Sequence, residues 1–171
     1  DFLIPPSRGV VKGGVLRNIE KDFAALLTPG LDLAFRDRER VALKGRTIMN
    51  ERAEREIWVC GPGAFVVLKA LAFANRGENK DAYDLYYVIR HFESGPADVA
   101  ARLKPMLKDA NVLKAMEILK RDFTREDGVG PKRVAAFYGR SGDAPLRADV
   151  VGFVVDFLAA CAPGGRKTKR K

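Results

Sequence analysis

The spacing of hydrophobic residues changes along the chain, from mixed patterns before residue 60 to a helical period after it. Residues 2–4 are apolar and are followed by two prolines, which predicts the end of a strand. From residue 15 apolar side chains recur three to four positions apart, which predicts a helix that ends before Pro29-Gly30. The members of this helical set are Leu16, Ile19, Phe23 and Leu26.

Alternation follows this predicted helix. Residues 31–35 alternate between apolar and polar and predict a short strand, whereas the charged segment at residues 36–40 is expected to face water. Residues 40–48 and 56–60 alternate again, so we expect them to pair as two strands on either side of a polar connection at residues 47–55.

Beyond residue 60 the pattern predicts only helices. Gly61-Pro62-Gly63 begins the first of them, with proline in its first turn. Further helices are expected at residues 81–92 and 96–108, around an apolar set between residues 112 and 123, between a break at 128–131 and residue 138, and from 143 to 161. The inner face of the last helix is expected to hold Leu146, Val150, Phe153, Val154, Phe157 and Cys161. The predicted fold class is therefore α+β, with short strands and a helix first and a helical bundle after them.

Composition narrows the class of protein further. The chain has 171 residues, of which 47% are hydrophobic and 31% charged, enough for a core of its own. We expect a strand-containing part at residues 1–60, a helical part at 61–162 and a disordered basic tail at 163–171. No uncharged apolar run approaches ~18 residues, so no membrane partner is expected.

Charge and cysteine content bear on partners and location. The net charge is +9, and five of the 31 basic residues lie in residues 166–171. Such a tail attracts nucleic-acid phosphates or simply keeps the chain soluble, and both interpretations stay open. Cys60 and Cys161 lack metal-ligand spacing, which predicts buried thiols in a reducing, cytoplasmic compartment.

The informative chemistry lies between residues 65 and 87. Lys69 is the only charge inside an otherwise apolar helix, and a buried ammonium needs a carboxylate or phosphate beside it. Arg76 lies within ~20° of Lys69 on a helical wheel, while Asp81 and Asp84 share the apolar face of the next helix. With a turn at residues 77–79, we expect Lys69, Arg76 and Lys80 to face Asp81 and Asp84.

From spacing alone, a purely structural interpretation of these residues is favoured over a functional one. Asp81 then caps its helix, Asp84 favours the first turn, and Lys69 with Asp84 forms a structural ion pair. The lone His91 is not expected to be catalytic. The aromatic residues are interpreted as packing rather than base-stacking residues, with Tyr83 and Tyr86 on the outer surface; they are Trp58, Tyr83, Tyr86 and Tyr87.

The segment from Val67 to Tyr87 resembles a signature of the AbiEii/AbiGii-type nucleotidyltransferase toxins, in which Lys-x-x-Ala is followed by Arg-x-x-x-Lys-Asp-x-x-Asp-Leu. Residues 59–65 are similar to that family's entry into the helix, and Asp1-Phe2-Leu3 is similar to the strand that carries its third carboxylate. The resemblance implies a partial minimal nucleotidyltransferase fold and transfer of a nucleoside monophosphate from an NTP to a tRNA-like RNA or a protein hydroxyl. It also implies Mg²⁺ and a possible cognate antitoxin.

Residue roles follow from the same resemblance. Asp1 would help to hold Mg²⁺ or take the acceptor's proton, and Lys69 would contact the triphosphate. Arg76 and Lys80 would bind phosphates or the acceptor. Asp84, with Asp81, would orient Lys69 or act on the acceptor hydroxyl. The family's Gly-Ser and Asp-x-Asp motif is absent from these 171 residues, so we expect it upstream of Asp1 and expect this chain alone to be inactive. A non-catalytic nucleic-acid-binding or protein-interaction module is the alternative.

Overall fold

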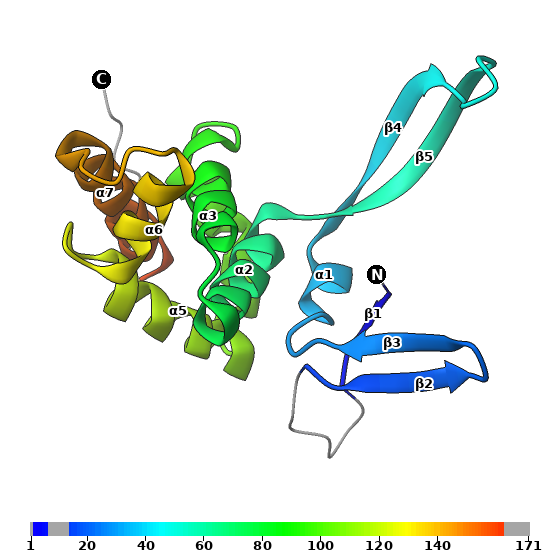
Figure 1. Ribbon diagram of the computed structural model, residues 1–171, viewed down its shortest axis with the longest axis horizontal. Coiled ribbons are helices and arrows are strands. Elements are labelled where there is room, and N and C mark those ends of the chain that lie inside the picture. The colour runs from blue at the N-terminus through cyan, green and yellow to red at the C-terminus, as the bar shows by residue number, and fades with distance from the viewer. Residues whose placement is uncertain (1, 7–13, 163–171) are drawn as a thin grey trace.

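Strands and helices occupy separate parts of the chain, which gives the protein an α+β fold (Figure 1). The structure is a computed structural model and describes residues 2–6 and 14–162. Within these ranges five strands and a short helix precede residue 61, and six α-helices follow it. Asp1 and the predicted tail at residues 163–171 lie outside the described residues.

A small sheet contains β1 (Leu3–Ile4), β2 (Leu16–Glu20) and β3 (Phe23–Leu27) in the order β1-β3-β2. The strand at residues 2–4 is confirmed, whereas the helix predicted from residue 15 is wrong. In the hairpin of β2 and β3, Leu16 lies opposite Leu26, and β3 also pairs in parallel with β1. Strand pairing with other segments overrides the local helical spacing. The hydrophobic spacing within one segment cannot reveal such pairing.

The chain then forms α1 (Leu33–Arg36) where a strand was predicted at residues 31–35. Leu33 is fully buried in the core, whereas Phe35 is 58% exposed, so the alternating set does not share one buried face. A single helical turn buries Leu33 without burying its neighbours. The backbone N–H of Leu33 donates to the Gly30 carbonyl at 3.0 Å. The predicted strand here is therefore wrong.

A two-stranded antiparallel ribbon contains β4 (Arg38–Arg46) and β5 (Arg52–Cys60). It confirms the predicted pairing, with strands that begin earlier and a connection of only residues 47–51. The ribbon projects away from the helices (Figure 1), so most of its residues are exposed. The apolar side chains Val41, Leu43, Ile57 and Val59 share one face of the ribbon, together with the charged Glu39 and Arg55.

The helical part contains α2 (Pro62–Arg76), α3 (Asn79–His91), α4 (Pro96–Leu103), a 3₁₀ turn η1 (Lys104–Met106), α5 (Ala110–Phe123), α6 (Val129–Phe137) and α7 (Ala144–Cys161). The helix predicted at residues 96–108 is thus divided into α4 and η1, and α6 begins inside the predicted break. On α7 the buried residues are Val150, Val154, Phe157 and Cys161, which confirms most of its predicted inner face. None of the described helices is long and apolar enough to cross a membrane.

The first helix of this part, α2, is central to the core. It packs against α3, α4 and α5, and its buried residues include Val66, Val67, Ala70 and Phe73. Phe73 also meets Phe123 of α5 edge to face, with ring centroids 5.1 Å apart. This surrounding core fixes the position of the few polar side chains that α2 and α3 carry.

Candidate functional site

The candidate site lies where α2 turns into α3. Gly77 ends α2 in the left-handed conformation, at φ 66°, and its N–H donates to the Phe73 carbonyl at 2.8 Å. A residue without Cβ adopts this conformation at little cost, so the chain can reverse within a few residues. The reversal brings the C-terminal half of α2 against the first turns of α3.

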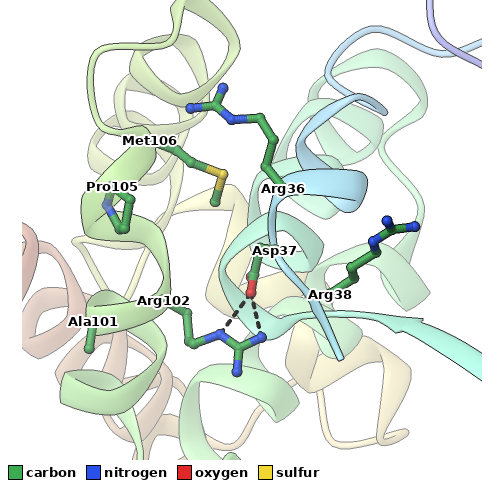
Figure 2. A pocket seen from close by; sticks show the side chains of 7 residues that line it. All are labelled: Arg36, Asp37, Arg38, Ala101, Arg102, Pro105 and Met106. Carbon is green, nitrogen blue, oxygen red and sulfur yellow. Dashed lines mark hydrogen bonds and ion pairs between the residues drawn. The ribbon is translucent and has the colours of Figure 1, made fainter. Parts of the chain in front are cut away.

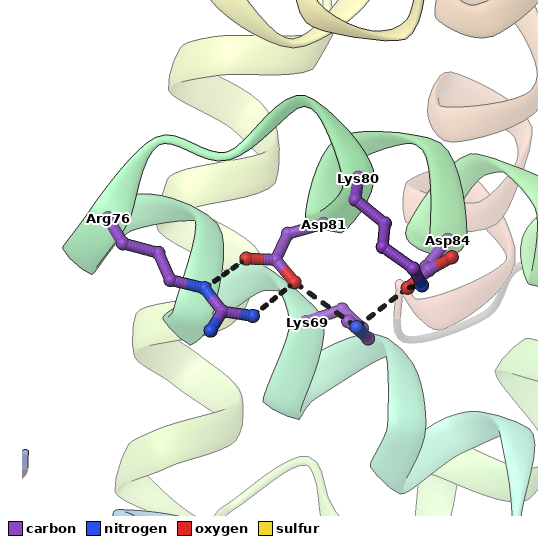
Figure 3. A network of polar contacts seen from close by, with 5 residues as sticks. All are labelled: Lys69, Arg76, Lys80, Asp81 and Asp84. Atoms are coloured by element: carbon purple, nitrogen blue, oxygen red, sulfur yellow. Dashed lines mark hydrogen bonds and ion pairs between the residues drawn. The ribbon is translucent and has the colours of Figure 1, made fainter. Parts of the chain in front are cut away.

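The structure brings Lys69, Arg76, Lys80, Asp81 and Asp84 together in one cluster, which we call the ion cluster (Figure 3). The Lys69 ammonium lies 3.1 Å from Asp81 Oδ1 and 2.7 Å from Asp84 Oδ2. Arg76 donates to both oxygens of Asp81, from Nε at 2.6 Å and from Nη2 at 2.8 Å. Lys80 reaches Asp84 Oδ2 at 2.7 Å.

Burial differs sharply across the ion cluster. The Asp81 side chain is 1% exposed and that of Lys69 21%, whereas Arg76 and Lys80 are more than half exposed. Asp81 is therefore the inner anchor, and the outer cations face solvent. The sequence-based arrangement of these five residues is found in the structure; their catalytic and binding roles stay predictions.

Hydrogen bonds decide the protonation states in the ion cluster. Burial disfavours the charged form of Lys69, yet the bonds to Asp84 and Asp81 outweigh it and raise the pKa of Lys69. Burial likewise disfavours ionised Asp81, but the Arg76 and Lys69 donors outweigh it and lower the pKa of Asp81. The pKa of Asp84 is lowered in the same way by Lys69 and Lys80. Lys69, Asp81 and Asp84 are thus held in their charged forms near neutral pH.

The ion cluster does not fit a magnesium site. Each carboxylate already accepts from two cationic side chains, and a divalent cation would have to displace them. Within residues 2–6 and 14–162, no three histidine, cysteine, aspartate or glutamate side chains are grouped to hold a metal ion. The predicted metal ligand, Asp1, lies outside the described residues, so Mg²⁺ stays a prediction.

A second buried carboxylate, Asp37, was not singled out from the sequence. It is 4% exposed, although the charged segment at residues 36–40 was expected to face water, and that expectation is wrong for this residue. Its Oδ2 accepts from the backbone N–H of Ala64 at 3.0 Å, and its Oδ1 accepts from Arg102 Nε at 2.7 Å. Asp37 therefore caps α2 from outside the helix and connects it to α4.

The glycines before α2 explain why the cap comes from so far away. Gly61 is the N-cap residue and has no side chain to offer, and a Cβ there would overlap the Asp37 carboxylate. At Gly63 a Cβ would lie 2.8 Å from the Leu103 backbone nitrogen. A helix start without its own capping side chain is the sequence signal that could have pointed to a distant carboxylate.

Beside Asp37 lies a cavity of about 310 Å³ between the start of β4 and α4 (Figure 2). Its lining includes Arg36, Arg38 and Arg102 together with Pro105 and Met106. The three guanidiniums do not converge: Arg36 pairs with Asp109 at 3.3 Å, Arg38 stacks over Trp58 at 4.2 Å, and Arg102 binds Asp37. Because each guanidinium is directed to a different partner, the cavity is lined by basic residues but does not form an anion-binding site.

The remaining candidate residues have structural environments. Tyr86 is 1% exposed and donates to Asp149 at 2.5 Å, so its placement on the outer surface is wrong. Cys161 is buried and Cys60 half-buried, and both are free thiols. Burial raises the pKa of Cys161 to about 12 and, with help from Asp37, that of Cys60 to about 11. Neither thiol is a nucleophile at neutral pH.

Fold and site geometry together define only a broad class: an α+β protein with an ion cluster at the turn between two helices. No protein-family model matches this chain, and no curated protein and no solved structure matches it. The assignment of function therefore depends on the site itself.

Proposed function

We propose that the protein is part of a nucleotidyltransferase that moves a nucleoside monophosphate from an NTP to a hydroxyl of an RNA acceptor. The observation that carries this proposal is the ion cluster, in which Lys69 is fixed by two carboxylates and flanked by Arg76 and Lys80. Phosphoryl transfer relies mainly on positioning and on charge neutralisation by preorganised cations, and the cluster offers both.

The roles follow from burial and charge. Lys69 keeps its proton and is held in one orientation, so it suits the charge that develops on the triphosphate. The exposed Arg76 and Lys80 can leave their carboxylates to meet phosphate oxygens of the NTP or of the acceptor. The buried Asp81 positions Lys69, and the more exposed Asp84 is the carboxylate that would act on an acceptor hydroxyl. A tRNA-like acceptor, an antitoxin partner, Mg²⁺ held by Asp1 and a cytoplasmic location belong to this proposal.

The test is transfer of label from α-³²P NTPs to RNA by the native gene product. Replacing Lys69 by Met keeps the apolar stem and removes the charge, and we expect transfer to fall by roughly 100-fold or more. Asp84→Ala should have a similar effect. The matched control is Lys114→Ala on the exposed side of α5, which should leave transfer unchanged. Full activity in both site variants would remove the assignment.

A non-catalytic nucleic-acid-binding module is the second candidate. The β4–β5 ribbon favours it, because Trp58 is 53% exposed and lies 4.2 Å from the Arg38 guanidinium and 5.1 Å from that of Arg40. Exposed aromatic rings beside arginines are typical of surfaces that bind unpaired bases. Salt-dependent RNA binding by the native gene product without any transfer would favour this candidate over the first.

A further inference from the structure

The exposed side of α3 carries a row of aromatic rings. Tyr83, Tyr87 and His91 follow one another at every fourth position, with ring centroids 5.7 Å and 4.6 Å apart. From Tyr83 to His91 the row extends about 12 Å along the helix at 1.5 Å per residue. Three or four stacked bases of a nucleic-acid strand cover about the same length, at 3.4 Å per base.

Two aromatic side chains at the end of α6 widen this row. The Tyr83 ring stacks on Phe137, with centroids 4.2 Å apart and planes inclined by 18°, and meets Tyr138 edge to face at 5.3 Å. We call these five residues the aromatic patch. Tyr87, Phe137 and Tyr138 are each 42–47% exposed, so at least three rings face solvent. A contiguous exposed group of this kind marks a binding surface rather than a core.

Cations border the aromatic patch at the end near the ion cluster. Lys80 lies on the same side of α3, one turn before Tyr83 and Asp84, and is 68% exposed. Arg133 lies one turn before Phe137 on α6, and its Nη1 donates to Asn79 Oδ1 at 3.2 Å, which places it at the start of α3. Arg140, two residues after Tyr138, pairs with Asp143. Because Arg133 is bound to a neutral amide and Lys80 shares Asp84 with Lys69, this border carries more positive than negative charge, which suits an anionic backbone.

We propose that the aromatic patch binds an unpaired segment of RNA. Bases stack on Tyr87 and Tyr138, and phosphates lie against Lys80 and Arg133. Stacking on aromatic rings beside cations is the usual way in which proteins hold single strands. The inference rests on the proposed function in taking RNA as the acceptor, and it adds the place where the unpaired end lies. Asp84 follows Tyr83 directly and pairs with Lys69 at 2.7 Å, so the Tyr83 end of the patch lies next to the ion cluster.

Fluorescence anisotropy with the full chain and a labelled single-stranded RNA of about 12 nucleotides tests this inference, with neither NTP nor Mg²⁺ present. Tyr87→Leu keeps the apolar surface but removes the ring, so we expect binding to weaken roughly tenfold. Tyr87→Phe keeps the ring and should bind as the wild type does. The matched control is Phe35→Leu on α1, at a similarly exposed aromatic residue outside the patch, and Trp58→Leu tests the ribbon as the competing surface. A duplex of the same sequence should compete poorly, because its bases are covered.

Salt dependence supplies the second measurement. Lys80→Gln and Arg133→Gln should each weaken binding and lower the slope of log K against log salt by about one. Wild-type affinity in Tyr87→Leu overturns the proposal, because a patch that binds a protein through apolar area tolerates leucine. Loss of binding in Trp58→Leu alone places RNA on the ribbon and overturns it too.

The two proposals fail separately. If the patch variants bind RNA normally while Lys69→Met abolishes transfer, the patch assignment is wrong and the proposed function stands. If RNA binding depends on the patch but the native gene product transfers no nucleotide, the proposed function is wrong and the patch assignment stands.

Discussion

Replacing Asp81 by Asn tests whether the inner carboxylate of the ion cluster stabilises the fold. The substitution keeps shape and volume and removes one charge. It weakens the bonds from Arg76 and Lys69 at a side chain that is 1% exposed. We expect a clear loss in the free energy of unfolding, measured by urea titration followed by circular dichroism at neutral pH.

The expected loss in unfolding free energy depends on which partners Lys69 and Arg76 retain after the substitution. Breaking a buried pair by removing one partner costs about 3–5 kcal/mol, because a buried charge is left alone. Lys69 is not left alone, since Asp84 stays 2.7 Å away, and Arg76 is 58% exposed and can be hydrated. We therefore expect Asp81→Asn to cost about 2–3 kcal/mol. Asp84→Asn is the matched control at about 1 kcal/mol, because Lys80 beside it is largely exposed.

Acid should erase the difference between the wild type and Asp81→Asn. The pKa of Asp81 is lowered from its ordinary value of 3.8, so its stabilising contribution is fully present above that value. The contribution is lost as the pH falls through the lower pKa of the folded state. The two proteins should therefore differ by a constant amount between about pH 5 and 8 and converge below about pH 4. Equal losses in both variants, or a difference that does not shrink as the pH falls below about 4, would contradict this reasoning.

Two further predictions concern the helix start and the thiols. Gly61→Ala should lower the free energy of unfolding by about 2 kcal/mol, because the added methyl overlaps the buried Asp37 carboxylate. The same change at Gly45, which has open space around its Cβ position, should leave thermal unfolding nearly unaltered. Cys60 and Cys161 should react with Ellman's reagent far more slowly at pH 8 in the folded protein than in urea, because burial raises their pKa values to about 11 and about 12. Rapid labelling of both thiols in the folded protein would refute their burial.

The ion cluster was predictable from sequence because its geometry is local. Lys69 and Asp81 are only twelve residues apart, on two helices joined by a tight turn at Gly77. Helical periodicity fixes the side of each helix, and the turn fixes which sides meet. The helical part as a whole follows the same logic, since its apolar stripes and its Gly and Pro punctuation are read within each segment.

The errors have the opposite origin. The β2–β3 hairpin depends on β1, which is distant in sequence, and Asp37 depends on Ala64 and Arg102, 27 and 65 residues away. A charged residue in a charged segment carries no local sign that it will be buried. The burial of Asp37 follows from its partners. Helix α2 begins without a capping side chain of its own, and Arg102 pairs with the buried Asp37 as well as with the exposed Glu39.

Helix α3 joins the ion cluster to the aromatic patch. Its inner side, with Leu85, Tyr86 and Ile89 buried, fixes the helix against the core. The spacing between Asp84 and Tyr87 on the other side is therefore set by the rigid backbone and not by a mobile loop. Phosphoryl transfer depends on holding the acceptor atom within a fraction of an ångström of the reacting phosphate. In the proposed function, α3 would meet that requirement with one element, because it carries both the carboxylate beside Lys69 and the rings proposed to hold the acceptor strand.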